Sequence, residues 1–248
     1  TMCMGFGCNA AGVISCRIID SPRERLIAII TNNFVPCNGR FPLLIAISSI
    51  FLGGLVNSQF TSLIAALTIL GTVIIGIFVT LIVSKIMSNT LLKGVPSSFS
   101  LELPPYRRPQ IGRIIVRSVF DRTLFVLGRA VAVAAPAGLV IWLMANISIG
   151  GDMSILDLSA NFLDPLGKAI GMDGYILMAF ILGFPANEIV IPIMIMGYTR
   201  ANMLIDMESL DALRELFILN GWSYLTGICV MLFSLLHFPC GTTLLTIK

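Results

Sequence analysis

Residues able to bind a metal ion lie where proline and glycine interrupt long apolar stretches of this chain. They combine cysteine thiols with amide, hydroxyl and carboxylate oxygens: Cys8, Asn9, Cys37, Asn187, Glu188, Cys240 and Thr242. Thiolates favour soft or borderline metals, whereas amide and carboxylate oxygens suit harder ones. The mixed set suits a borderline ion such as Fe²⁺ or Mn²⁺, and it would hold that ion loosely enough to release it. It therefore predicts a transient metal pathway, with no permanently bound cofactor.

Glu188 is the most informative of these residues, because it lies inside an apolar stretch. A carboxylate there costs about 2.5–3.5 kcal/mol on insertion scales, so we expect it to be buried beside a partner, with Arg129 as a candidate. Its role is either functional or that of a structural ion pair. His237, close to the interruption at Pro239, either caps a helix or supplies a further ligand.

The composition places these residues in a membrane protein. Hydrophobic residues make up 56% of the 248 residues and charged residues only 12%, against about 25% charged in soluble domains. The net charge of +3 is too small to favour a nucleic acid partner. The lipid bilayer is therefore the first partner that the sequence predicts.

Five stretches are long enough to cross a hydrocarbon core, which takes about 20 helical residues. They are 60–83, 124–149, 34–56, 174–198 and 222–247, of which the last three carry the proline clusters. Proline removes a helix donor and clashes with the preceding turn. Freed backbone groups are tolerated at membrane depth only inside protein or beside a water-filled cavity. We therefore expect an all-α bundle whose broken or re-entrant helices face a pathway.

The distribution of charge along the chain predicts which segments lie on which side of the membrane. Residues 84–123 are rich in lysine and arginine and should be cytoplasmic, whereas the acidic loop 150–173 should lie outside. Apolar residues at helical spacing in 111–119 predict a helix lying in the membrane interface. Residues 201–220 predict an amphipathic helix, either a solvated connector or a docking site for a soluble domain.

The interrupted stretches contain an internal repeat. Residues 5–9 match 183–187 in glycine, phenylalanine and asparagine, and a Pro-Cys pair follows each, at 36–37 and 239–240. Many transporters consist of two related halves whose discontinuous helices form the site at the midplane. We expect one gate-like half in 1–123, which includes the basic segment, and the other in 124–248. Whether the halves are parallel or inverted is left open.

Six motifs in this order resemble the membrane domain of FeoB-type ferrous iron transporters. They lie at residues 5–9, 21–26, 34–42, 183–188 and 238–240, with Leu101-Glu102-Leu103-Pro104-Pro105-Tyr106-Arg107 the most specific match. The resemblance implies that Fe²⁺ is conducted into the cell across a prokaryotic plasma (inner) membrane, with Mn²⁺ or Zn²⁺ as other possible ions. It also implies that Cys8, Cys37 and Cys240 are pore cysteines. Homo-oligomerisation and small cytosolic Feo-type accessory proteins are further expectations of the resemblance.

The sequence departs from the family pattern in three ways. Ala10 and Ala11 stand where a proline usually follows the Gly-Cys motif, and Asn187 stands where lysine often precedes the glutamate. No phosphate-binding Gly-x-x-x-x-Gly-Lys-Ser/Thr motif occurs. We therefore expect the G-protein domain, and with it GTP hydrolysis, to lie elsewhere in a longer protein. The first membrane helices should precede Thr1, and this chain should not be an enzyme.

Three other functions remain open at this point. Gate-type regions are also described as nucleoside-recognition modules, so the cargo is either a metal ion or an organic solute. A structural membrane subunit is a second alternative, although it leaves Glu188 without a role. A membrane enzyme using Cys240 with His237 is a third, but the sequence offers no group to orient the pair.

Overall fold

The computed structural model describes residues 2–52, 60–92, 94, 110–148, 153–201, 203–204, 207 and 209–247. Every regular element in these ranges is helical, as predicted. The α-helices are α1 (Met2–Gly7), α2 (Asn9–Ser15), α3 (Pro22–Thr31), α4 (Phe41–Ile47), α5 (Thr61–Asn89), α6 (Ile111–Arg117), α7 (Phe125–Asn146), α8 (Ile155–Ala169), α9 (Gly174–Leu182), α10 (Val190–Thr199), α11 (Leu210–Leu219), α12 (Tyr224–Leu236) and α13 (Gly241–Ile247). The motif at 101–107 lies outside the described residues.

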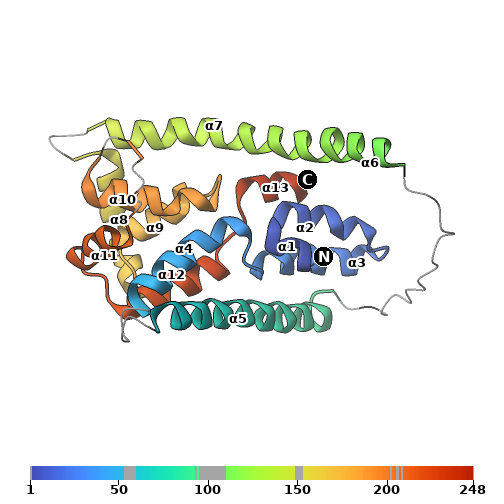
Figure 1. The fold of residues 1–248 in the computed structure, drawn as a ribbon, viewed down its shortest axis with the longest axis horizontal. Helices are drawn as coiled ribbons and strands as arrows, with labels where there is room; N and C mark the ends of the chain where they lie inside the picture. Colours follow the sequence, from blue (N-terminus) through green and yellow to red (C-terminus); the bar gives the residue numbers. More distant parts are fainter. Residues whose placement is uncertain are drawn as a thin grey trace.

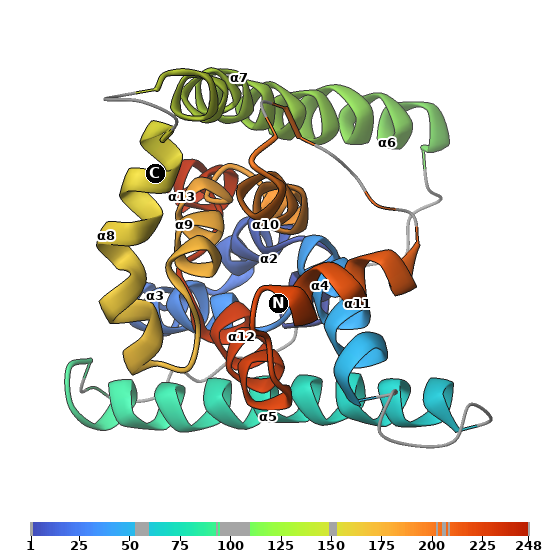
Figure 2. The same ribbon diagram turned by 90° about the vertical axis from the view of Figure 1, so that its left-hand side faces the viewer.

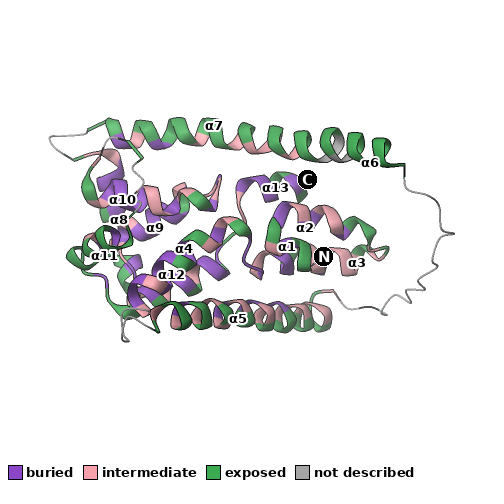
Figure 3. Ribbon diagram, viewed as in Figure 1, coloured by how far each residue is buried: buried purple, intermediate pink, exposed green. Residues whose placement is uncertain are grey.

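Two long helices flank a central group of short ones (Figures 1 and 2). Helices α5 and α7 are the two unbroken segments predicted to cross the membrane, and Pro136 lies inside α7 without breaking it. Their apolar side chains are largely exposed, whereas the buried residues concentrate in the short helices between them (Figure 3). This distribution fits helices whose outer surface is in contact with lipid, and the chain is a multi-pass membrane protein.

The predicted interfacial helix is not a separate element. Helix α6 passes through a π-helical segment, Ser118–Leu124, and continues directly into α7 (Figure 1). No proline or glycine lies between residues 113 and 127 to end the helix. The segment 111–119, which we expected to lie in the membrane interface, is therefore an extension of α7.

The three proline clusters break their helices as predicted. In the first broken span, Pro22–Leu52, residues 32–40 separate α3 from α4. In the second broken span, Tyr224–Ile247, residues 237–240 separate α12 from α13. Residues 183–189 separate α9 from α10, but these two helices return to the same end of the molecule. Their outer residues Tyr175 and Tyr198 are in contact, with ring centroids 5.5 Å apart.

Helices α9 and α10 therefore form a re-entrant hairpin whose tip consists of residues 183–189. We call it the second hairpin, because another hairpin precedes it in the chain. Helices α1 and α2 meet at Cys8 and form the first hairpin. The two lie at opposite ends of the molecule (Figure 1). The two broken spans also run in opposite directions, because Phe51 at the end of the first stacks on Trp222 at the start of the second, with centroids 5.6 Å apart. The repeat that the sequence left undecided is thus inverted.

The two ends of the molecule differ in charge, in agreement with the predicted threading. The end with the first hairpin contains Arg23, which donates a hydrogen bond to the Ser88 hydroxyl at 2.7 Å. The opposite end contains the acidic segment, where we expected a loop and find the helix α8. Ser154 and Asp157 form a capping box that begins this helix, a signal in the sequence that we missed.

The amphipathic segment 201–220 is also shorter than predicted. Of the residues described in this segment, only those of α11, Leu210–Leu219, are helical, and Ser209 caps the start of the helix. Its buried face packs within the chain, where Phe217 stacks on Trp222 with centroids 4.2 Å apart. Leu213 and Phe217 are therefore already covered by the protein itself, whereas Leu210, Ile218 and Leu219 are exposed.

Arg40 ties the two broken spans together at their breaks. It is 0% exposed, and its guanidinium donates to the backbone oxygens of Asn33 at 2.9 Å, Leu235 at 3.1 Å and Phe238 at 3.4 Å. Asn33 adds a bond from Nδ2 to the His237 oxygen at 2.7 Å. Carbonyl groups near the end of α12 are thereby satisfied inside an apolar environment.

We expect Arg40→Lys to lower the free energy of unfolding by about 2–3 kcal/mol, because an ammonium group cannot reach the same spread of acceptors and bonds to charged groups are worth that much. Denaturation in mixed micelles measures the change. Arg113→Lys, at an exposed position of α6, is the matched control and should change stability by less than about 0.5 kcal/mol. Equal losses in both variants would contradict the assigned role of Arg40.

Candidate functional site

The two breaks and the tip of the second hairpin meet at one place, which we call the junction. The Gly241 amide of the second broken span donates to the Phe184 oxygen of the hairpin tip at 2.7 Å. Gly39 of the first broken span lies against the side chain of Glu188, whose Oε1 would be 3.3 Å from a Cβ at that position. With the bonds of Arg40, these contacts join all three interrupted segments.

Three buried side chains with metal-binding atoms come together at the junction, one from each segment. Asn187 Nδ2 lies 3.8 Å from Cys37 Sγ, and Asn187 Oδ1 lies 3.3 Å from His237 Nε2. All three residues are less than 9% exposed. The structure thus brings together Cys37 and Asn187, two of the predicted ligands, and adds His237, which also forms the C-cap of α12.

Aromatic rings surround this group. Phe180 and Phe233 lie with ring centroids 5.1 Å and 5.9 Å from the His237 ring, and Phe238 lies at 5.1 Å. The rings pack on one another and on the imidazole, which holds His237 in place.

The structure corrects our expectation for Glu188. The residue is exposed, although it lies at the hairpin tip, and the described residues include no ion pair between it and Arg129. Arg129 instead lies over the ring of Phe125, 4.5 Å from its centroid. The buried charge at the breaks is the guanidinium of Arg40, which the sequence analysis did not single out.

Cys240 is the last residue of the break in the second broken span, and Thr242 lies in the first turn of α13. Cys240 Sγ is 3.1 Å from the Thr243 hydroxyl, and Thr242 is buried. Cys240 and His237 thus bond to different partners, which offers no support for the nucleophile and base of an enzyme.

Cys8 and Asn9 lie at the tip of the first hairpin, and Asn32 connects this tip to the first broken span. Cys8 is exposed, whereas Asn9 is buried and its backbone oxygen accepts a bond from Asn32 Nδ2 at 2.9 Å. Asn32 Oδ1 fits between two glycines: a Cβ would lie 2.6 Å from it at Gly5 and 2.4 Å at Gly12. Both glycines are therefore needed for the side chain to hold the tip.

Arg40 and Asn32 are the residues that sequence reasoning missed. Arg40 stands four residues after Pro36, and Asn32 stands four before it, in a segment otherwise rich in apolar residues. A polar side chain so close to a predicted break is the signal that could have identified them, since freed backbone groups require partners there.

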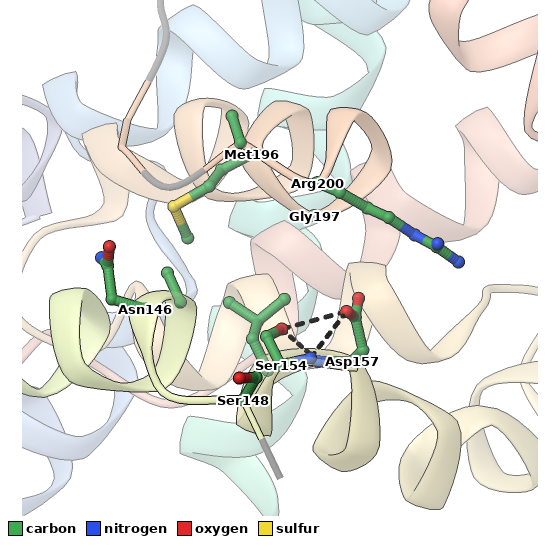
Figure 4. A pocket seen from close by; sticks show the side chains of 10 residues that line it. Asn146, Ser148, Ser154, Asp157, Met196, Gly197 and Arg200 are labelled. Atoms are coloured by element: carbon green, nitrogen blue, oxygen red, sulfur yellow. Dashed lines mark hydrogen bonds between the residues drawn. The ribbon is translucent and has the colours of Figure 1, made fainter. Parts of the chain in front are cut away.

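A separate pocket of about 270 Å³ lies away from the junction, at the acidic end (Figure 4). It is bounded by the end of α7, the start of α8 and the end of α10. Asp157 there accepts bonds from Ser154 and, at 2.7 Å, from the Tyr175 hydroxyl. Its carboxylate is already satisfied, so the pocket offers no free ligand group comparable to those at the junction.

We expect Gly12→Ala to destabilise the protein by about 1–3 kcal/mol, the usual cost of overpacking, because the new methyl group would overlap Asn32. Gly7→Ala is the matched control: no atom lies within 4 Å of a Cβ there. Unfolding of both variants in mixed micelles measures the difference. A loss as large for Gly7→Ala as for Gly12→Ala would contradict the role of Asn32.

The chain matches two family models. Residues 69–122 match "Ferrous iron transport protein B C terminus", and residues 127–248 match "Nucleoside recognition", a model named Gate. No solved structure matches the chain.

Relatives with a common name align with the chain. A protein of Staphylococcus aureus named "Fe(2+) transporter FeoB" is 27% identical over 100% of the chain and 35% of its own length. The protein of the same name from Methanocaldococcus jannaschii is 25% identical over 100% of the chain and 36% of its own length. That of Legionella pneumophila is 28% identical over 77% of the chain and 25% of its own length. The chain thus spans about a third of the length of the first two relatives, and over its whole length it is similar to these proteins named as FeoB transporters.

Proposed function

We propose that this chain forms the permeation core of a transporter that carries ferrous iron into the cell. The observation that supports this most directly is the junction, where three helix interruptions bring Cys37, Asn187 and His237 together. Irregular backbone at membrane depth is typical of the place where a transporter binds its cargo. The FeoB relatives, which are named as Fe²⁺ transporters, support Fe²⁺ as that cargo.

The chemistry of the residues supports an ion that is held briefly. The described residues contain no group of three histidine, cysteine, aspartate or glutamate side chains able to hold a metal. A thiol with amide oxygens binds less tightly than a closed site of four cysteines, and conduction needs binding that is weak enough to reverse. Cys8 with Asn9, and Cys240 with Thr242, would provide further contacts along the pathway. Glu188, being exposed, would attract the cation towards the junction.

The inverted repeat supports a pathway that is approached from both sides. The first hairpin reaches the junction region from the basic end and the second hairpin from the acidic end (Figure 1). By the positive-inside rule the basic end is cytoplasmic, in a prokaryotic plasma membrane. In the complete protein we propose a GTP-binding domain that controls the pathway, association into homo-oligomers and small cytosolic accessory proteins. In this scheme the chain itself conducts the ion and catalyses no reaction.

We expect Cys37→Ser, Cys240→Ser and Glu188→Gln each to reduce the initial rate of Fe²⁺ uptake about tenfold, the scale on which changes around metal sites act. The complete protein is reconstituted in liposomes, and uptake of Fe²⁺, Mn²⁺ and Zn²⁺ is measured under anaerobic conditions with GTP.

Cys229→Ser is the matched control for these variants, because Cys229 lies within α12 and away from its break. It should leave the uptake rate unchanged. Unaltered uptake in all three site variants would refute the proposed site. Uptake of a nucleoside in place of any metal ion would favour the organic-solute alternative, to which the "Nucleoside recognition" match and the aromatic rings at the junction give some support.

A further inference from the structure

The protonation of His237 is fixed by its surroundings. Its Nδ1 lies 2.8 Å from the backbone oxygen of Ser234. A carbonyl oxygen only accepts hydrogen bonds, so Nδ1 carries the proton and Nε2 keeps its lone pair. A bond of this type to a backbone carbonyl orients the ring in many metal-binding histidines.

The lone pair of Nε2 is directed at another acceptor. Asn187 Oδ1 lies 3.3 Å away, while Nδ2 of the same amide is directed at Cys37 Sγ. Two acceptors share no proton, and in a buried place they repel each other unless a positive group lies beside both. A metal ion would remove this repulsion.

The distance between the two atoms fits a pair of ligands on one ion. Metal–nitrogen and metal–oxygen bonds are about 2.1 Å long, which places two ligands about 3.0 Å apart at an octahedral right angle and about 3.4 Å apart at a tetrahedral angle. The observed 3.3 Å between Nε2 and Oδ1 lies within this range.

We propose that His237 is a nitrogen ligand of the transported ion, bound through Nε2 together with Asn187 Oδ1. The inference rests on the proposed function and makes it more specific. Imidazole strengthens binding to Fe²⁺ more than to Mn²⁺, in the order usual for nitrogen ligands. The site therefore selects a borderline transition metal over Mg²⁺ and Ca²⁺, which prefer oxygen ligands alone.

The imidazole is held in place independently of the ion. Its ring packs against both Phe180 and Phe233, which also contact each other, and the backbone amide of His237 donates to the Phe233 oxygen at 2.8 Å. A ligand fixed in this way loses little conformational freedom when the ion arrives. Asn187, which also contacts Cys37 through Nδ2, is then the link between the hairpin and the two broken spans.

Electron spin echo spectroscopy with Mn²⁺ as the probe tests this inference. The complete protein, without a histidine tag, is placed in lipid nanodiscs and loaded with Mn²⁺ alone. We expect modulation from one directly bound imidazole ¹⁴N, its replacement by a ¹⁵N signal after labelling with [¹⁵N]histidine, and its loss in His237→Gln. Glutamine retains an oxygen that can bind metal, so Mn²⁺ should remain bound in this variant. The change from a ¹⁴N to a ¹⁵N signal in the labelled protein identifies a histidine ligand without any substitution.

Phe238→Leu is the matched control: Phe238 contacts the same imidazole but offers no ligand, so the nitrogen signal should persist. Bound Mn²⁺ without a nitrogen signal, or a signal that persists in His237→Gln, would overturn the inference. A water molecule between Nε2 and Oδ1, or an amide of Asn187 turned to donate to Nε2, would give the first of these results.

Metal uptake by liposomes that contain the same preparation separates the inference about His237 from the proposed function. Uptake without the nitrogen signal refutes the role of His237 alone, and absence of uptake refutes the proposed function.

Discussion

The structure depends on one requirement: the backbone groups freed where helices break must find hydrogen-bond partners inside the protein. Lipid offers none, and each unsatisfied group would cost several kcal/mol. Arg40 meets much of this requirement, because one guanidinium provides donors to three backbone oxygens from two spans. The same residue places a fixed positive charge beside the proposed pathway for cations.

The inverted repeat explains how such breaks come to meet. Each half supplies a hairpin that enters from one side and a span that crosses and is interrupted on the way. Inversion places the two hairpins at opposite ends, so both tips and both breaks approach the same depth (Figure 1). The continuous helices α5 and α7 close this arrangement on two sides (Figure 2). Arg40 and the polar side chains of the junction are thereby buried in protein, which the bilayer requires of such groups.

Local signals in the sequence predicted the membrane class, the unbroken spans and the positions of the breaks, because proline acts on its own helix and apolar length reports span length. The sequence did not reveal whether 174–198 crosses the membrane or turns back, because a crossing helix and a re-entrant hairpin have the same hydropathy. The turn depends instead on packing between distant residues, such as the contact of Tyr175 with Tyr198. It also misplaced the buried charge. Glu188 and Arg40 each lie beside a break, and only the packing of the other segments decides which is enclosed. Cys37 and Asn187 were identified by residue type, but their contact joins residues 150 positions apart.

The central claim is that the transported ion passes through the junction between Cys37 and Asn187. Anomalous X-ray diffraction from crystals of the complete protein soaked in Fe²⁺, with data collected on both sides of the iron absorption edge, tests it most directly. The account predicts an anomalous peak within bonding distance of Cys37 Sγ and Asn187 Oδ1. Anomalous peaks elsewhere in the membrane region, with none at the junction, would contradict it.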